Sequence, residues 1–305
     1  MLTLQPQSLD WALAHAMRYG DTDVFPVPFE YDAIRHDWDE VRQYLVQQNV
    51  IDWVVRPHRA LLSPKAKYGF RVITQLDPLD FLVFTALVYE IAADIEIQRV
   101  PAASEIVLSY RVRTEPTGQF FDPAIGYRRY LEKCREVLDA EAGFTHVAIA
   151  DIADFYPRIY HHRLDNALRA ATQKASHVKA IMGLLSRWNG TETFGIPVGN
   201  APSRVLAEIT ISDIDEALLA RGIRFIRFND DFRIFATSHS AGYRSLAVLA
   251  DLLYRNHGLT LQTQKTKVLP VEDFRQEFLI SPFDREVDSL YQKFEQLAAA
   301  LGLND

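Results

Sequence analysis

The sequence lacks several features that define common classes of protein. Its 305 residues include a single cysteine, Cys134, which excludes an internal disulfide and a zinc site built from cysteines. No run approaches the roughly 18 uninterrupted apolar residues that a membrane-spanning helix needs. The first residues, MLTLQPQSLDW, lack the basic start and apolar core of a signal peptide. These absences favour a cytoplasmic protein that does not enter a membrane.

The chain also lacks an excess of positive charge, because its formal net charge is −7 at pH 7. A nucleic-acid-binding protein usually has a basic balance, yet binding depends on local patches more than on the total. Two groups of cations could form such patches. The first group is Arg221, Arg224, Arg227 and Arg233, and the second is Lys65, Lys67 and Arg71.

The apolar content is sufficient for a substantial core, since 48% of the residues are hydrophobic. Residues 78–96 are apolar on most sides and predict a buried helix, whereas FTHVAIAD, ending at Asp151, suits a central strand buried on both faces. Residues 202–222 predict one long helix, with a proline near its start and a glycine after its end. Helices and strands alternate without a strict βαβ rhythm, so we expect an α+β fold with a mostly antiparallel sheet.

The stretch RFIRFNDDFRIFAT, residues 224–237, predicts a hairpin with Asp230 and Asp231 at its tip. An Asn-Asp turn alone requires no special site. Asp151 also ends a strand, however, and three carboxylates would meet if that strand and the hairpin were neighbours. Clustered carboxylates repel one another and need cations, and Mg²⁺ prefers oxygen ligands. Two such ions, roughly 4 Å apart, would activate a 3′-hydroxyl and stabilise a leaving pyrophosphate, as in nucleotidyl transfer.

The order of these parts resembles that of the reverse transcriptases. ADIADFYPRI (150–159) resembles motif A, with Asp151 in the metal-binding place, and FNDD (228–231) resembles the aromatic-x-Asp-Asp motif C. GIPVGNAPSRVLAE (195–208) is similar to motif B. HGLTLQTQKT (257–266) is similar to motif D, with Lys265 at its lysine. Upstream, PKAKYGFRVITQLDPLD and SYRVR resemble fingers motifs, so the resemblance covers roughly residues 60–270.

The resemblance implies a right-hand polymerase fold of fingers and palm, with the thumb reduced or absent. The expected parts are an N-terminal helical extension (1–60), fingers (61–140), a palm with interleaved fingers helices (141–280) and a C-terminal amphipathic helix (281–305). Only about 35 residues follow motif D, so a fragment, a reduced thumb and a thumb supplied by another subunit stay open. The last helix has an apolar seam that would suit a partner subunit or a second copy. The seam consists of Val287, Leu290, Phe294, Leu297 and Leu301.

The resemblance also implies roles for single residues. Asp151, Asp230 and Asp231 would hold two Mg²⁺ ions, or Mn²⁺ as a substitute, and Lys265 would protonate or shield the leaving pyrophosphate. Tyr156 matches the aromatic gate that crowds a ribose 2′-hydroxyl and favours deoxynucleotides. Val198 replaces a glutamine that contacts the nucleotide in other branches, and Arg204 is a candidate substitute for it. The residues expected around the nucleotide are Lys65, Arg71, Ile152, Asp154, Phe155, Tyr156, Gly199 and Arg204.

The segments around the motifs, including the Ile-Pro-Val-Gly of motif B, resemble the bacterial abortive-infection and unknown-group reverse transcriptases. That branch is associated with defence against phage. The resemblance implies a polymerase that adds dNTPs to a 3′-hydroxyl to make DNA, with RNA as a template or an associated partner. Untemplated or protein-primed synthesis is a variant that the reduced thumb would suit. The alternative is a reverse-transcriptase-like module that binds RNA or a protein and does not depend on catalysis.

Overall fold

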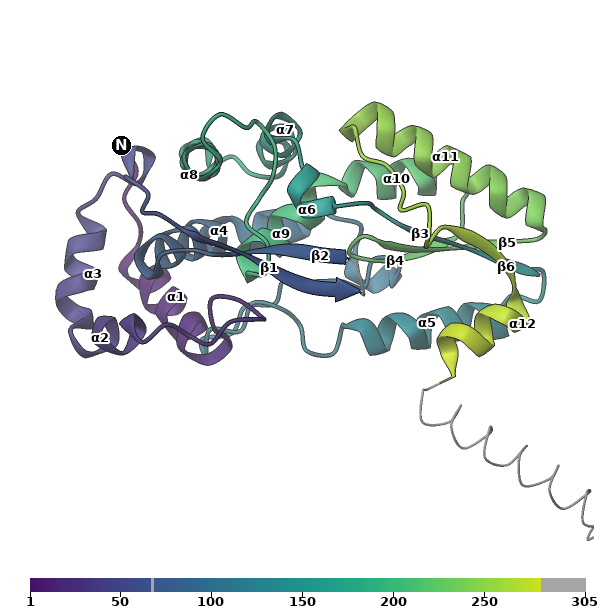
Figure 1. The fold of residues 1–305 in the computed structure, drawn as a ribbon, viewed down its shortest axis with the longest axis horizontal. Helices are drawn as coiled ribbons and strands as arrows, with labels where there is room; N and C mark the ends of the chain where they lie inside the picture. Colours follow the sequence, from purple (N-terminus) through teal and green to yellow (C-terminus); the bar gives the residue numbers. More distant parts are fainter. Residues whose placement is uncertain (67–68, 281–305) are drawn as a thin grey trace, which may run out of the picture.

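The computed structural model describes residues 1–66 and 69–280, with the backbone alone for residues 65 and 66. In the N-terminal part, the first helix packs on one long helix, α4 (Pro78–Gln98), and the next two short helices contact the first (Figure 1). The expected buried helix is confirmed, because the side chains from Asp80 to Val88 are all buried. The N-terminal helices are α1 (Pro6–Tyr19), α2 (Glu30–His36), α3 (Trp38–Val46) and the short turn η1 (Val50–Asp52).

The central sheet has four strands in the order β4-β5-β3-β6, and each neighbouring pair is antiparallel. The predicted central strand is confirmed, since β3 has a partner on both edges and is buried from Val147 to Asp151. The predicted hairpin is confirmed as well, because β4 pairs with β5 directly across a two-residue loop. The strands are β3 (His146–Asp151), β4 (Phe225–Phe228), β5 (Asp231–Ala236) and β6 (Lys267–Pro270).

Helices cover both faces of this sheet, α11 (His239–His257) on one and α5 (Tyr127–Ala140) with α12 (Val271–Phe274) on the other (Figure 1). Alternate side chains of β3 point to opposite faces, as the pleat of a strand requires. Ala148 and Ala150 join the core on the α11 side, whereas Val147 and Ile149 join the core beneath α5. The small residues let α11 approach closely: a Cβ at Gly242 would lie 2.9 Å from Val268.

The segment 202–222, predicted as one long helix, is two helices, α9 (Ala201–Thr210) and α10 (Ser212–Ala220), with Ile211 between them. The Thr210 hydroxyl donates a 2.7 Å hydrogen bond to the Leu206 carbonyl, a bond that bends helices. The break follows a β-branched run from Ile209 to Ile211, which adds to the strain of a continuous helix. The sequence pattern showed the helical period but not this break.

A second, two-stranded sheet consists of β1 (Arg59–Ala66) and β2 (Gly69–Gln75). In the described part of the chain these two strands pair only with each other. The C-terminal helix predicted over residues 281–305 lies outside the described residues, and the proposed domain boundaries stay a prediction. The other helices and turns are η2 (Ala102–Ser104), α6 (Phe155–Arg158), α7 (His161–Ala171), α8 (Ala175–Asn189) and the π-helical η3 (Arg275–Leu279). Among the described helices, none combines the length and the apolar character that crossing a membrane requires.

Candidate active site

The three predicted metal-binding aspartates lie at one end of the central sheet. Asp151, the last residue of β3, is the register partner of Asp231, the first residue of β5. Asp230 precedes Asp231 in the hairpin loop, and its carbonyl accepts a 3.0 Å hydrogen bond from the amide of Ile152. Because β3 and β5 are neighbours, the hairpin tip is fixed against the end of the motif A strand. The sheet topology thus supplies the juxtaposition that the sequence only suggested.

The three carboxylates influence one another electrostatically. The pKa of Asp230 is raised to about 6 by burial first, and then by the negative charges of Asp151 and Asp231. Each carboxylate also has a neighbour of its own. Lys265 donates to Asp151 at 2.6 Å, the Asn229 amide donates to Asp230 at 3.0 Å, and Arg233 donates to Asp231 at 3.3 Å.

These residues have the chemistry that a hard cation needs, because all three offer carboxylate oxygens and their mutual repulsion is incompletely neutralised. Across residues 1–66 and 69–280, no three His, Cys, Asp or Glu side chains are arranged closely enough to enclose an ion. Asp151 and Asp231 are turned toward Lys265 and Arg233 instead. A bound cation would therefore compete with these two side chains for the carboxylate oxygens.

A cleft of about 700 Å³ lies beside Asp230 and extends from β2 to the motif A segment. Most of the residues predicted to surround the nucleotide line this cleft. They are Arg71, Ile152, Asp154, Phe155, Tyr156, Gly199 and Arg204. Of the remaining candidates, Lys65 has no described side chain and Lys67 lies outside the described residues. Lys265 does not line the cleft and contacts Asp151.

Backbone strain is concentrated along the same cleft. Four non-glycine residues of the described chain have positive φ, and three of them, Tyr110 (44°), Asp154 (47°) and Asn229 (55°), line the cleft. A non-glycine residue in this region costs roughly 1–3 kcal/mol and persists where the surroundings fix it, which is common at functional sites. Asp154 stands immediately before α6 and is exposed. Its carboxylate is thus free to face a ligand in the cleft.

Tyr156, the candidate sugar gate, is half-buried on the cleft wall. Its hydroxyl donates a 3.3 Å hydrogen bond to the side-chain oxygen of Asn229. Burial, and then the neighbouring Tyr110, Glu208 and Asp230, hold the pKa of Tyr156 well above its ordinary value. The phenol therefore remains a protonated donor at neutral pH. Its hydrogen bond to Asn229 of motif C holds the ring in place.

The motif B loop packs against the fingers hairpin. The Val198 carbonyl accepts from Thr74 of β2 at 3.0 Å, and the Gly199 carbonyl accepts from the amide of Asp23 at 3.1 Å. Gly199 has a φ of 108°, and a Cβ there would lie 3.1 Å from Ile73. Only glycine adopts this backbone readily in so little space. The loop therefore fixes β2, and with it Arg71, beside the cleft.

Arg204 lies on the boundary of the cleft and a second cavity of about 310 Å³, and it lines both. Its guanidinium pairs with Asp23 of the N-terminal extension and stacks 5.0 Å from the ring centre of Tyr110. Burial lowers the pKa of Arg204 to about 10, so the side chain stays charged at neutral pH. Sequence reasoning selected Arg204 but gave no sign of its partner Asp23.

The arginines around the hairpin do not form the expected basic patch. Arg227 and Arg233 are buried, with 1% and 2% of the residue exposed, and both are ion-paired inside the palm. Arg224 pairs with Glu141, the residue that follows α5. Of the four arginines, only Arg221 is both exposed and bonded solely to a backbone carbonyl. The prediction failed because charge alone reveals neither burial nor the carboxylates that pair with these side chains in the fold.

Several residues that line the cleft were not predicted from the sequence. Tyr110 lies in the SYRVR segment, which resembled a fingers motif without singling out the tyrosine. Asn229 has positive φ, a conformation that asparagine tolerates better than most residues. That preference is the one feature of the sequence that could have marked Asn229 as a turn residue of the site. Arg158 and Phe194 also line the cleft, with the Arg158 guanidinium 5.9 Å from the ring centre of Phe194. Nothing in the local sequence pattern marks that pair.

The model of the family "Reverse transcriptase (RNA-dependent DNA polymerase)" matches residues 105–279. No curated protein matches the sequence significantly. Among solved structures, apo telomerase from Candida tropicalis, truncated from its C-terminal domain, has a TM-score of 0.50 at 13% identity and covers 71% of this chain and 51% of that one. Telomerase from Candida albicans, solved with a TWJ fragment of telomeric RNA, has a TM-score of 0.48 at 13% identity.

The C. albicans match covers 80% of this chain and 48% of that chain, so this chain spans about half the length of the solved telomerases that it matches. The structural likeness supports the expected α+β fold of fingers and palm. The family match spans more than half of the chain and includes motifs A to D, with Asp151, Asp230 and Asp231 inside it. The chain belongs to the reverse transcriptase family.

Proposed function

We propose that the protein is an RNA-directed DNA polymerase that adds dNTPs to a 3′-hydroxyl in the cleft beside Asp230. The observation that carries this proposal is the register pairing of Asp151 with Asp231, with Asp230 in the adjoining loop. Membership of the reverse transcriptase family supports the same reaction class. RNA is the proposed template or associated partner, and DNA is the product.

Asp151, Asp230 and Asp231 would hold two divalent cations, Mg²⁺ or Mn²⁺ in its place. When bound, such cations lower the barrier by activating the attacking hydroxyl and stabilising the leaving group. Asp230 must be deprotonated to bind a cation, and its pKa is raised by burial first and then by the negative charges of the other two carboxylates. A bound cation would offset both effects and favour the deprotonated carboxylate.

The other cleft residues would bind and orient the nucleotide. Arg71 and Arg204, which both line the cleft, would supply positive charge for phosphate oxygens. The ring of Tyr156, fixed through Asn229, would crowd a ribose 2′-hydroxyl and so favour deoxynucleotides. Lys265, now bound to Asp151, would shift to the leaving pyrophosphate once a cation replaces it on that carboxylate.

The test uses the purified protein with dNTPs, Mg²⁺ and a primed RNA. We expect labelled DNA from the wild type and none from Asp230→Ala. Asp251→Ala serves as the control, because it removes an exposed α11 carboxylate that pairs with Arg255. Equal amounts of DNA product from Asp230→Ala and the wild type would refute the polymerase function proposed for this site. Sequencing the product would show whether synthesis copies the RNA or proceeds without a template.

The segments around motifs A and B resemble the bacterial abortive-infection and unknown-group reverse transcriptases, which supports a role in defence against phage. Protein-primed or untemplated synthesis is the variant of the reaction to test. Phage should form fewer plaques on cells that carry the protein than on cells that carry the Asp230→Ala variant. Protection that survives replacement of both Asp230 and Asp231 would instead favour the non-catalytic binding module. A DNA product covalently bound to the protein would identify protein priming.

A further inference from the structure

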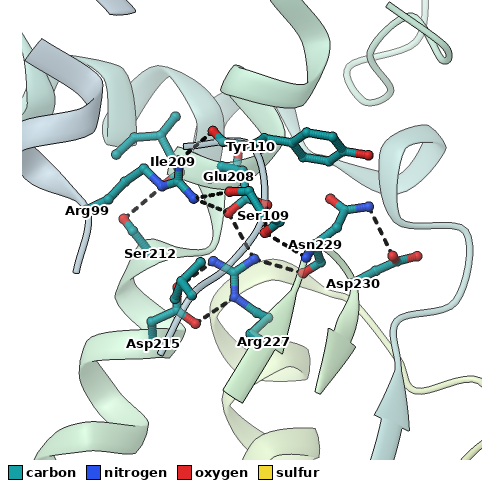
Figure 2. Close-up of polar contacts among 12 residues, drawn as sticks. Arg99, Ser109, Tyr110, Glu208, Ile209, Ser212, Asp215, Arg227, Asn229 and Asp230 are labelled. Atoms are coloured by element: carbon teal, nitrogen blue, oxygen red, sulfur yellow. Dashed lines mark hydrogen bonds and ion pairs between the residues drawn. The ribbon is translucent and has the colours of Figure 1, made fainter. Parts of the chain in front are cut away.

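The residue before Asp230 is held by both of its backbone polar groups. The Asn229 amide donates a 2.8 Å hydrogen bond to the hydroxyl oxygen of Ser109, and Arg227 Nη1 donates a 2.8 Å bond to the Asn229 carbonyl (Figure 2). Phe228 and Asp231 are the last paired residues of the hairpin, so Asn229 and Asp230 make up the whole loop. Fixing Asn229 therefore fixes the path of the chain into Asp230.

This loop needs support from outside the hairpin. Asn229 has a φ of 55°, whereas Asp230 is not among the residues with positive φ. The favoured type I′ turn requires positive φ at both central residues, and type II′ strongly prefers glycine at the first. The hairpin thus places an asparagine, which tolerates positive φ at some cost in backbone strain, where glycine would be unstrained. Such strain persists only where neighbouring groups determine the conformation.

Ser109 is itself oriented by a buried carboxylate. Its hydroxyl donates a 2.5 Å hydrogen bond to Glu208 Oε1, which leaves the oxygen lone pairs for the amide of Asn229 (Figure 2). Glu208 Oε2 in turn lies 2.7 Å from Arg99 Nη2 and 3.1 Å from Arg227 Nη1. Ser109 and Glu208 are both 0% exposed, so water cannot replace either one.

Arg227 is anchored in the same way. Its Nε and Nη2 donate hydrogen bonds of 2.7 and 2.5 Å to the carboxylate of Asp215. Its Nη1 donates to the Asn229 carbonyl. The cluster therefore contains two arginines, Arg99 and Arg227, and two acids, Glu208 and Asp215. Charges buried this deeply persist when each is paired and hydrogen-bonded. The contacts of this cluster converge on one residue of the turn.

We propose that Ser109, oriented by Glu208, is a positioning residue that sets the turn in which Asp230 is presented to a cation. Ser109 does not touch the carboxylates and acts through the Asn229 amide. The proposal rests on the proposed function, since that function makes Asp230 a metal ligand. It predicts that cation binding depends on a hydroxyl that lies outside the metal-binding set.

The experiment compares Ser109→Ala with the wild type and with three further variants. Thr85→Val is the matched control, because it removes an equally buried hydroxyl for which the described residues offer no hydrogen-bond partner. Asp230→Ala tests the metal site itself. Two readouts are taken on the full chain, Mn²⁺ affinity by electron paramagnetic resonance and hydrogen exchange of the Asn229 amide relative to the amides of β3.

In Ser109→Ala we expect Mn²⁺ affinity to fall about tenfold, the usual scale for a buried donor left without its acceptor. The Asn229 amide should exchange faster while β3 stays protected, and Thr85→Val should match the wild type in both measurements. Ser109→Thr, which keeps the hydroxyl, should restore the affinity. Unchanged Mn²⁺ binding in Ser109→Ala would overturn the proposal. Faster exchange throughout β3 would also overturn it, since the hydroxyl would then stabilise the whole palm.

Asp230→Ala separates this inference from the proposed function. Loss of Mn²⁺ binding in Asp230→Ala with no loss in Ser109→Ala would refute the positioning role alone. Mn²⁺ binding that is unaffected in Asp230→Ala would refute the metal site, and with it the function on which the inference rests.

Discussion

Lys265 Nζ lies 2.6 Å from Asp151 Oδ2, so a lysine of motif D neutralises the central carboxylate of motif A. The strands explain this contact. The amide of Gln262 donates to the Asp151 carbonyl at 2.7 Å, and Ile152 bridges to Leu261. Motif D therefore runs beside the end of β3, and its lysine is well placed to compete with a cation.

Replacing Lys265 with methionine should strengthen cation binding in the absence of nucleotide. Lys265 is half-exposed, although Asp151 is buried, and an ion pair with an exposed lysine is worth about 1 kcal/mol or less, so we expect Mn²⁺ affinity to rise about two- to fivefold. The polymerisation rate should fall, because Lys265 would no longer reach the pyrophosphate. Lys267→Met, which breaks a similar pair with Glu277, is the control and should leave Mn²⁺ affinity unchanged. Weaker binding in Lys265→Met would contradict the competition.

The sugar gate can be tested by changing the size of residue 156. Tyr156→Val removes the ring from the cleft wall and should raise ribonucleotide use relative to deoxynucleotide use by about tenfold or more. Tyr156→Phe keeps the ring and loses only the 3.3 Å bond to Asn229, so its selectivity should stay close to that of the wild type. The ratio of kcat/KM for dATP and ATP measures the effect. A wild-type enzyme that prefers ribonucleotides would refute the gate.

Asp23 should weaken nucleotide binding, because it shares the guanidinium of Arg204 at the edge of the cleft. In Asp23→Asn the arginine keeps its charge and loses its carboxylate partner. We expect the KM for dNTPs to fall about two- to fivefold, since the competing pair is partly exposed. Asp32→Asn, which affects an exposed pair with Arg35, should leave the KM unchanged. A higher KM in Asp23→Asn would mean that Asp23 orients Arg204 productively.

His15 should make the fold less stable in mild acid. The pKa of His15 is lowered to about 4, chiefly by burial; the hydrogen bond to the Gly118 carbonyl opposes this shift, and the charge of Arg204 contributes a smaller lowering. The unfolded chain, with a histidine pKa near 6.5, binds more protons between about pH 4 and 6.5. Stability therefore rises with pH across this window and is lost as the pH falls.

Urea unfolding at pH 7.5 and pH 5 measures this effect. His15 should account for a loss of about 2 kcal/mol in the free energy of unfolding at pH 5. His15→Gln should be less stable at pH 7.5 but should lose less on acidification. His162→Gln, which removes an exposed histidine, should keep the wild-type slope. An identical slope in His15→Gln would show that other groups cause the acid sensitivity.

The sequence was informative where local pattern determines structure. The unbroken apolar run before Asp151 predicted a central strand, and the Asn-Asp pair between two β-favouring runs predicted the hairpin. Both are properties of neighbouring residues. The meeting of Asp151 with Asp231 then required only that the two strands be adjacent, which the antiparallel sheet provides.

The sequence was uninformative where a residue depends on a distant partner. Arg227 looked like a surface cation, yet Asp215 and Glu208 from two helices enclose it. Asp23 gave no sign that it would reach Arg204, because the contact joins the N-terminal extension to α9. Pairings of this kind arise from the three-dimensional arrangement, and neither hydrophobic period nor turn chemistry encodes them.

Arg99, Glu208 and Arg227 come from the end of α4, from α9 and from β4, so their ion pairs link three elements that are far apart in the sequence. Separating any pair would leave an uncompensated charge in the protein interior, which is strongly unfavourable. These elements should therefore behave as one rigid block when a nucleotide arrives. The β1–β2 hairpin is attached beside the cleft through the motif B loop, where the Thr74 amide donates to the Val198 carbonyl at 3.0 Å. Arg71 should therefore keep its place on the cleft wall, as the carboxylates do, when a triphosphate binds.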